Sequence, residues 1–340
     1  MRRVAFAAVC LLVSADGALG HELFGMHLQN NVAFEQEFNA MERLGVTWVR
    51  RHIPWSNVEP REGKFDWTFW DQMIDGAARH HLHLMITVNA LSAWGSTELP
   101  PNFGEKGGYK AVYPPKDLKQ YATFIGTLVG HYRGRGIAWQ IENEVDAKTF
   151  WAGTREQYLE LLKTAYAAAH RADPAAVVLP AGLTSPFPHT DNIQRRLDRH
   201  HEWFDAILDT QAYDALDMHD YQLPESDPMW KTWGVSFEQY IELYQGWMKA
   251  KRVNKPLWIS EAGVNSAPIA IESGRYTFTP EQQARDLESI YKAAQAHGVA
   301  HVFWLKLFDT SETVYSTMGV SAAREPKPSA TVYRRLATTW

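Results

Sequence analysis

The stretch AWQIENE at residues 138–144 opens a unit that recurs along this 340-residue chain. Residues 138–141 form a short, largely apolar run, which is typical of a buried strand, and polar side chains follow it directly. A helical pattern comes next at 155–171, and a second strand-like run comes at 177–179. Two parallel strands need a crossover between them, so this unit predicts a strand, a helix and a parallel strand.

The same alternation extends over the whole chain. The strand-like runs are 23–28, 47–50, 84–88, 138–141, 177–179, 215–218, 257–260 and 302–304, and the helical patterns are 35–44, 67–80, 118–132, 155–171, 202–210, 237–251, 280–297 and 329–337. An open doubly wound sheet and a closed barrel both fit this order. Eight strands, and the lack of a G-x-G-x-x-G motif after the first, favour a single-domain α/β fold, the (β/α)8 TIM barrel.

The N-terminus has the pattern of a secretory signal peptide. Arg2 and Arg3 precede an apolar run at 4–13, and small residues follow at 18–20. We therefore expect residues 1–20 to be a signal peptide, residues 21–340 to be the catalytic domain, and the protein to be secreted or periplasmic. A buried N-terminal helix is the alternative. No later stretch has about 20 consecutive apolar residues, so we expect no integral membrane segment.

Composition narrows the classes of partner. A net charge of −5 without basic runs argues against nucleic acid, and a single cysteine excludes a disulfide framework. The chain contains 14 tryptophans, a surplus that suits stacking on flat sugar rings.

Acidic residues occur where a barrel carries its chemistry, at the C-terminal ends of strands. Glu144 follows the fourth strand-like run and Glu261 follows the seventh. Paired carboxylates suit glycosidic cleavage, although a salt bridge at the rim is the alternative for either one alone. Strand alternation points Glu142 to the same side as Glu144, but only Glu144 follows an asparagine, Asn143.

Several motifs together resemble the clan A glycoside hydrolases, which are retaining β-glycosidases on (β/α)8 barrels. They are VRRHIPW at 49–55 with VEPREGKFDW at 58–67, Asn143-Glu144, His219-Asp220-Tyr221, WISE at 258–261, and Pro326-Lys327-Pro328. In layout the chain is most similar to families 39 and 5, from residue 24 to the end. It departs from the clan at Val145, where a proline is usual.

The resemblance and the chemistry together suggest a role for each residue. Glu261 would be the nucleophile, kept ionised by Arg50 and Tyr221, and Glu144 would be the acid/base. Asn143 would hold the sugar 2-hydroxyl. The remaining predicted substrate-binding residues are His219, Trp304, Trp94 and Trp230.

We therefore expect a retaining β-glycosidase that acts as a monomer on oligo- or polysaccharides, cuts within the chain, and uses no cofactor or metal. Aromatic residues in the long predicted loops favour an extended cleft. An exo-acting enzyme on small glycosides and a non-catalytic carbohydrate-binding barrel remain alternatives. A metal-dependent barrel would use His-x-His after the first strand, where only His27 occurs, while His80, His81 and His83 precede the third strand.

Overall fold

The structure is a computed structural model that describes residues 22–29, 33–101, 111–185, 193–221, 235–271, 274–311, 316–322 and 325–340. The predicted signal peptide and Trp230 lie outside the described residues. None of the described helices is long and apolar enough to cross a membrane.

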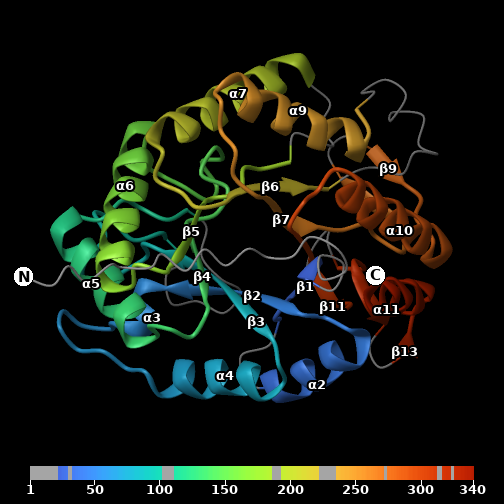
Figure 1. Ribbon diagram of the computed structural model, residues 1–340, viewed down its shortest axis with the longest axis horizontal. Helices are drawn as coiled ribbons and strands as arrows, with labels where there is room; N and C mark the ends of the chain where they lie inside the picture. Colours follow the sequence, from blue (N-terminus) through green and yellow to red (C-terminus); the bar gives the residue numbers. More distant parts are fainter. Residues whose placement is uncertain are drawn as a thin grey trace, which may run out of the picture.

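Within the described residues, eight parallel strands form a nearly closed barrel, as the sequence predicts (Figure 1). They are β1 (Phe24–His27), β2 (Trp48–Pro54), β3 (His83–Asn89), β4 (Ala138–Ile141), β5 (Val177–Pro180), β6 (Leu216–Asp220), β7 (Leu257–Ala262) and β10 (His301–Trp304). Their order is β5-β4-β3-β2-β1-β10-β7-β6, so the first and last strands of the barrel are neighbours. Between the two ends of this order, the Asp214 amide donates to the Val178 carbonyl at 2.8 Å.

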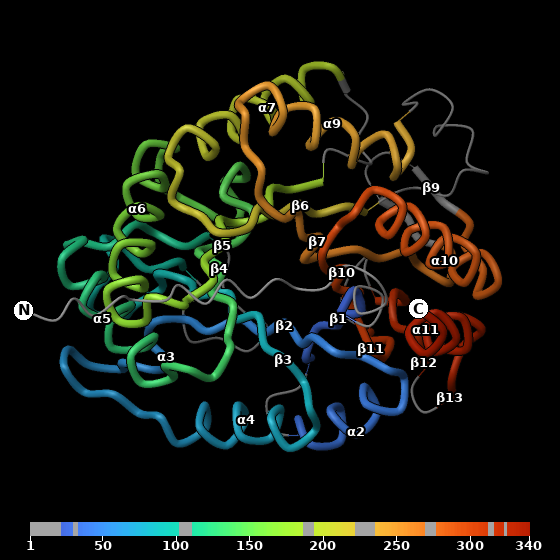
Figure 2. Tube along the Cα trace, viewed as in Figure 1, coloured from blue at the N-terminus to red at the C-terminus, as the bar shows by residue number. Residues whose placement is uncertain are grey.

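The main helices surround the strands, and the chain runs around the barrel in sequence order (Figure 2). They are α2 (Phe34–Leu44), α4 (Thr68–Arg79), α5 (Leu118–His131), α6 (Arg155–Ala172), α7 (Ile193–Thr210), α9 (Phe237–Ala250), α10 (Pro280–Ala296) and α11 (Pro328–Thr339). Thr154 and Ser236 form capping boxes that start α6 and α9. Helix α7 begins nine residues before the predicted start because its first half, 193–201, is mostly polar and hides the apolar period.

Short elements that the sequence did not predict decorate this barrel. They are α3 (Trp55–Val58), the pair β8 (Ile269–Ile271) and β9 (Gly274–Tyr276), and the small sheet of β11 (Lys306–Phe308), β12 (Gly319–Ala322) and β13 (Glu325–Pro326). Such elements have too few residues to show a period.

The barrel interior is built in two layers. One layer is apolar and includes Met85, Ala138 and Trp258 on their strands and Ala215 directly before β6. Two positions later on the same strands, and so on the same face, come the buried polar residues Thr87, Gln140, Asp217 and Ser260. The interior therefore changes from apolar to polar toward the C-terminal ends of the strands.

Several strands continue beyond their predicted ends, β2 the furthest. The ladder between β2 and β3 continues to the pair Pro54–Asn89, so Arg50 lies in the middle of β2 and not at its end. Glu261 likewise lies within β7. Polar side chains that face the barrel mouth do not interrupt a ladder, because its hydrogen bonds come from the backbone.

Candidate active site

Glu261, on β7, is held between a cation and a hydroxyl. Its Oε1 lies 2.5 Å from Arg50 Nη1, and the Tyr221 hydroxyl donates to Oε2. Burial alone would raise the pKa of Glu261, but the positive charges of His219 and Arg50 outweigh it and hold that pKa below its usual value. The Glu261 carboxyl group is therefore kept ionised.

Arg50 connects this carboxylate to the other side of the barrel. It is fully buried, and its Nη2 donates to Asn143 Oδ1 and to Gln140 Oε1, each at 2.7 Å. Its Nε donates to Thr87 Oγ1 at 3.0 Å. A single guanidinium thus fixes Glu261 and the amide of Asn143 relative to one another.

Glu144 lies in the turn that follows β4. The strand ends at Ile141, and Glu142 and Glu144 have positive φ values of 68° and 48°. The Glu144 amide donates to the Gly182 carbonyl at 2.9 Å, and His219 Nδ1 lies 3.0 Å from Glu144 Oε1. Burial raises the pKa of Glu144, and the negative charge of Glu261 raises it further, while His219 opposes the rise.

The prediction that Glu142 and Glu144 point the same way does not hold. Strand alternation no longer applies beyond Ile141, and the Glu142 carboxylate accepts hydrogen bonds from the side chain of Asn89 and the amide of Ala90. Glu144, in contrast, contacts His219, which also lies beside Glu261.

His219 lies between the two carboxylates, and its role in binding substrate stays a prediction. Its Nδ1 lies 3.0 Å from Glu144 and 3.7 Å from Glu261, and its Nε2 lies 3.0 Å from Ser260 Oγ. Burial lowers the pKa of His219, but Glu261 and Glu144 outweigh it and raise that pKa overall. Sequence reasoning missed the residues beneath it: Ser260 donates to Asp217, and both belong to the polar interior layer.

The two carboxylates are close. One ligand atom each from Glu144, His219 and Glu261 all lie within 4.8 Å of one another. A carboxyl separation of about 5–5.5 Å suits direct attack on a sugar, whereas an intervening water needs about 6.5–9.5 Å. This trio also has the donors of a metal site, but Arg50 lies against Glu261 and a raised pKa favours protonated His219, so the set suits a cation poorly.

The predicted aromatic residues have different surroundings. Trp304 is fully buried, and its Nε1 donates to the Met318 carbonyl at 2.7 Å. Trp94 is half-buried, packs edge-on against Trp55 at 4.9 Å, and donates from Nε1 to the Glu59 carbonyl. Their roles as sugar-binding residues stay predictions.

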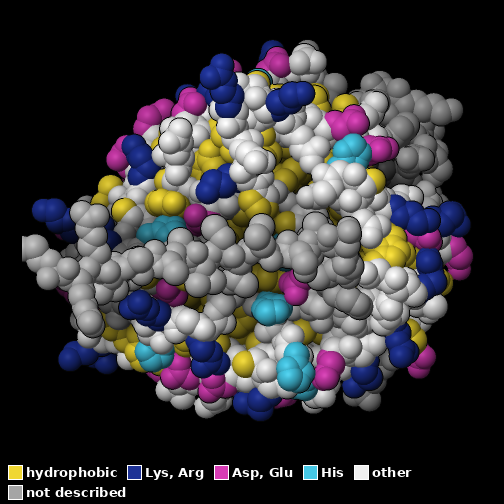
Figure 3. Space-filling view, in the orientation of Figure 1, with side chains coloured by type: hydrophobic (Ala, Val, Ile, Leu, Met, Phe, Trp, Pro, Cys, Tyr) yellow, Lys and Arg dark blue, Asp and Glu magenta, His cyan; other side chains and the backbone are white. Residues whose placement is uncertain are grey.

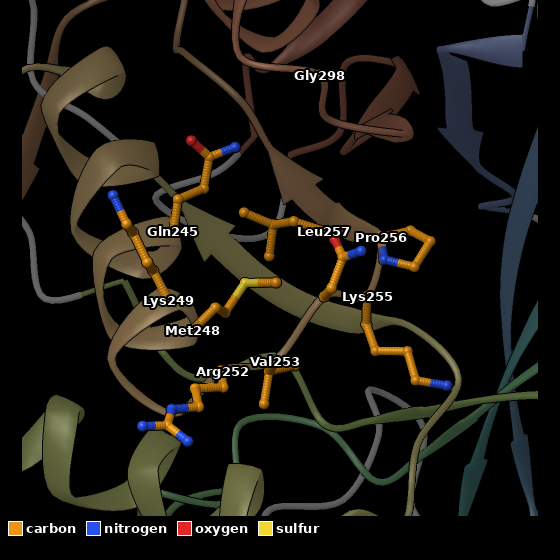
Figure 4. Close-up of a pocket in the computed structure, with 10 residues that line it drawn as sticks. Gln245, Met248, Lys249, Arg252, Val253, Lys255, Pro256, Leu257 and Gly298 are labelled. Atoms are coloured by element: carbon orange, nitrogen blue, oxygen red, sulfur yellow. The ribbon is translucent and has the colours of Figure 1, made fainter.

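A pocket of about 510 Å³ occurs at the opposite end of the barrel (Figure 4). It lies between the end of α9 and the start of β7, and Lys249, Arg252 and Lys255 are among its lining residues. Glu261 lies toward the other end of the same strand, so this pocket is separate from the carboxylate pair.

Comparisons with known proteins agree with the barrel fold. The glycosyl hydrolase family 42 model, described as beta-galactosidase, matches residues 27–175, which include Arg50, Asn143 and Glu144. A family 39 glycoside hydrolase from Bacteroides cellulosilyticus WH2 superposes with a TM-score of 0.66 at 16% identity, covering 94% of this chain and 64% of that chain. The GH39 enzyme from Xanthomonas axonopodis pv. citri gives a TM-score of 0.67 at 16% identity, covering 93% and 66%. The chain has the fold of the clan A glycoside hydrolases.

A curated protein also matches part of the chain. Over 150 residues, which cover 41% of each protein, the chain is 27% identical to Endo-1,4-beta-xylanase 2 from Claviceps purpurea. The chain therefore spans less than half the length of that xylanase, and about two thirds of the family 39 structure.

Proposed function

We propose that this chain is a retaining β-glycosidase, with Glu261 as the nucleophile and Glu144 as the acid/base. The observation that carries the proposal is a close pair of buried carboxyl groups, with ligand atoms within 4.8 Å, of which only Glu261 pairs with Arg50. In keeping with this arrangement, the pKa is lowered for Glu261 and raised for Glu144. Glycosidases need one ionised and one protonated carboxyl group at the same bond.

In the first step, the Glu261 carboxylate attacks the anomeric carbon while the bond from that carbon to the leaving oxygen breaks. Glu144 gives its proton to the leaving oxygen, so an alcohol departs and a glycosyl ester forms on Glu261. Asn143, whose carbonyl oxygen accepts from Arg50, directs its amide group to the sugar 2-hydroxyl.

In the second step, Glu144 is a carboxylate and takes a proton from water. The oxygen of that water attacks the anomeric carbon and releases Glu261, which retains the configuration of the substrate. Between the steps, His219 at 3.0 Å stabilises the negative charge that Glu144 acquires.

The proposed substrate class rests on the surplus of aromatic residues in the sequence. We propose β-linked oligo- or polysaccharides cut within the chain, with Trp94, Trp230 and Trp304 binding sugar rings by stacking. Action at chain ends on small glycosides is the alternative. The β-galactosidase model and the xylanase make β-galactosides and β-xylosides the first substrates to test. Secretion through residues 1–20 belongs to the same proposal.

The test is a screen of β-linked polysaccharides and aryl β-glycosides, with product sizes and NMR of the first-formed anomer. We expect a β anomer, and activity below about 1% of wild type for Glu261→Gln on an unactivated substrate. Asp214→Asn, at the other end of the barrel, is the matched control and should stay active. An α anomer from a β-linked substrate, or an active Glu261→Gln variant, would contradict the proposal.

A further inference from the structure

Glu142 is a buried carboxyl group for which the proposed reaction has no direct use. It is 1% exposed and lies directly before Asn143 and Glu144. Its backbone amide donates to the Val88 carbonyl at 3.1 Å, which extends the β3–β4 ladder by one bond. Its side chain, however, turns away from the reacting pair toward the end of β3.

The contacts of this side chain are two hydrogen-bond donors on one neighbouring segment. Glu142 Oε2 accepts from Asn89 Nδ2 at 3.0 Å, and Oε1 accepts from the Ala90 amide. Asn89 Oδ1 in turn lies 3.3 Å from His52 Nδ1 on β2. The carboxyl group therefore ties the residue after β4 to the ends of β3 and β2.

The backbone at this point needs such a tie. Glu142 and Glu144 both have left-handed φ values, 68° and 48°, although each carries a side chain. A left-handed conformation is strained for a residue with a Cβ, and it persists only where surrounding contacts enforce it. Arg50 holds Asn143 in the middle of this turn and Gly182 holds the Glu144 amide, while Glu142 holds the start.

We propose that Glu142 is a positioning residue that holds the turn presenting Asn143 and Glu144 to the substrate. The assignment of Glu144 as acid/base rests on the proposed function, but the positioning role itself does not. A displaced Glu144 would leave His219 and Glu261, the two neighbours that set its ionisation. Burial raises the pKa of Glu142 to about 7, and the bonds from Asn89 and Ala90 oppose that rise, so these contacts favour the ionised carboxylate.

The first readout needs no substrate. In ¹³C-carboxyl NMR titrations of the full chain, we expect the pKa of Glu144 to move toward the usual value of 4.5 in Glu142→Gln. The amide nitrogen that replaces one carboxylate oxygen is itself a donor, so it cannot accept from Asn89 or from the Ala90 amide. Asn89→Ala keeps the carboxyl group of Glu142 and removes one of its two hydrogen-bond donors, and it should shift the pKa of Glu144 in the same direction. Asp214→Asn, a carboxylate that accepts a backbone amide at the far end of the barrel, should leave Glu144 unchanged.

The second readout separates acid catalysis from general damage. Phenyl β-xyloside and β-galactoside need a proton on the leaving oxygen, whereas the 2,4-dinitrophenyl analogues leave without one. For the sugar that wild type accepts, we expect kcat/KM of Glu142→Gln to fall about 10–100-fold on the phenyl glycoside and under about 3-fold on the dinitrophenyl one.

Each result decides between the two claims. A Glu144 pKa that stays at its wild-type value in both variants overturns the positioning role, as does a shift in Glu142→Gln alone, which the lost charge explains. Equal losses on both leaving groups overturn it as well. If Glu144→Ala itself shows no dependence on the leaving group, the proposed function fails while the pKa result for Glu142 still stands.

Discussion

The ends of β4 and β7 each present one glutamate, and the two are equally exposed, at 8%. Burial therefore acts on both in the same sense and raises the pKa of each. Their pKa values nevertheless move in opposite directions, down for Glu261 and up for Glu144. Burial alone does not assign the roles of an acid pair.

The difference lies in the neighbours. Glu261 has the Arg50 guanidinium and the Tyr221 hydroxyl, and both favour a carboxylate. Glu144 has His219, which it shares with Glu261, and the negative charge of Glu261 itself. Pairing with Arg50 thus lowers the pKa of Glu261, whereas the neighbouring ionised Glu261 helps to raise the pKa of Glu144.

The largest expected effect comes from removing the cation. In Arg50→Met, a buried carboxylate loses its partner, so the free energy of unfolding should fall by about 3–5 kcal/mol in urea titrations. Since the pKa of Glu261 is lowered in the fold, its ionisation stabilises the native state above about pH 4.5, and this contribution is lost as the pH falls. In Arg50→Met, the free energy of unfolding should therefore fall less than in wild type as the pH is lowered through the acidic range.

The matched control is Arg335→Met, which removes an exposed pair with Glu288. Exposed pairs contribute about 0–1 kcal/mol, so this variant should unfold like wild type. Equal losses in the two variants would mean that Arg50 does not pair with a buried charge.

Glu142 gives a second, oppositely signed pH effect. Its pKa rises from 4.5 to about 7 on folding, so its contribution to stability is present below about pH 4.5 and lost as the pH rises to about 7. The stability of wild type relative to Glu142→Gln should therefore fall by about 3 kcal/mol between pH 4 and pH 8. A difference that stays constant with pH, measured in urea at both values, would refute the buried ionisation.

Tyr221→Phe sharpens the comparison at Glu261 by removing one hydrogen bond and little volume. A bond to a charged acceptor contributes about 1.5–3 kcal/mol, so kcat should fall by roughly one to two orders of magnitude. The acidic limb of the pH–kcat/KM profile should move upward, but less than in Arg50→Met. An unchanged limb would remove Tyr221 from the control of Glu261.

Trp94→Ala should have the smallest effect on the site. If the ring stacks on sugar, calorimetry with long oligosaccharides should show binding weakened by about 1–2 kcal/mol. The melting temperature should fall too, because the ring packs on Trp55. Unchanged binding with a lower melting temperature would assign Trp94 to the core alone.

The sequence predicts the parts of this molecule that depend on local pattern. Period and length identify the eight barrel strands, and the position of Glu144 and Glu261 at strand ends follows from barrel topology. On the face of Figure 3, acidic and basic side chains are interspersed around the periphery, in keeping with the mixed charge of the sequence.

The sequence does not predict contacts between distant strands. Arg50 meets Glu261 across 211 positions, and Gln140 lies within hydrogen-bond reach of Ser260 across 120 positions, which no local period reveals. One signal was available: a polar residue two positions after an apolar one in a strand, as in Met85 and Thr87, marks the polar interior layer. The positive φ of Glu142 carried no signal, since only glycine or asparagine would have marked it.

The central claim is that the pKa of Glu144 is raised above the usual glutamate value and the pKa of Glu261 is lowered below it. A ¹³C-carboxyl NMR titration of the full chain tests it without any substrate, with Glu144→Gln and Glu261→Gln spectra to assign the two signals. We expect the Glu261 signal to titrate below 4.5 and the Glu144 signal above it. Both signals at the usual value, or the reverse order, would contradict the assignment of nucleophile and acid.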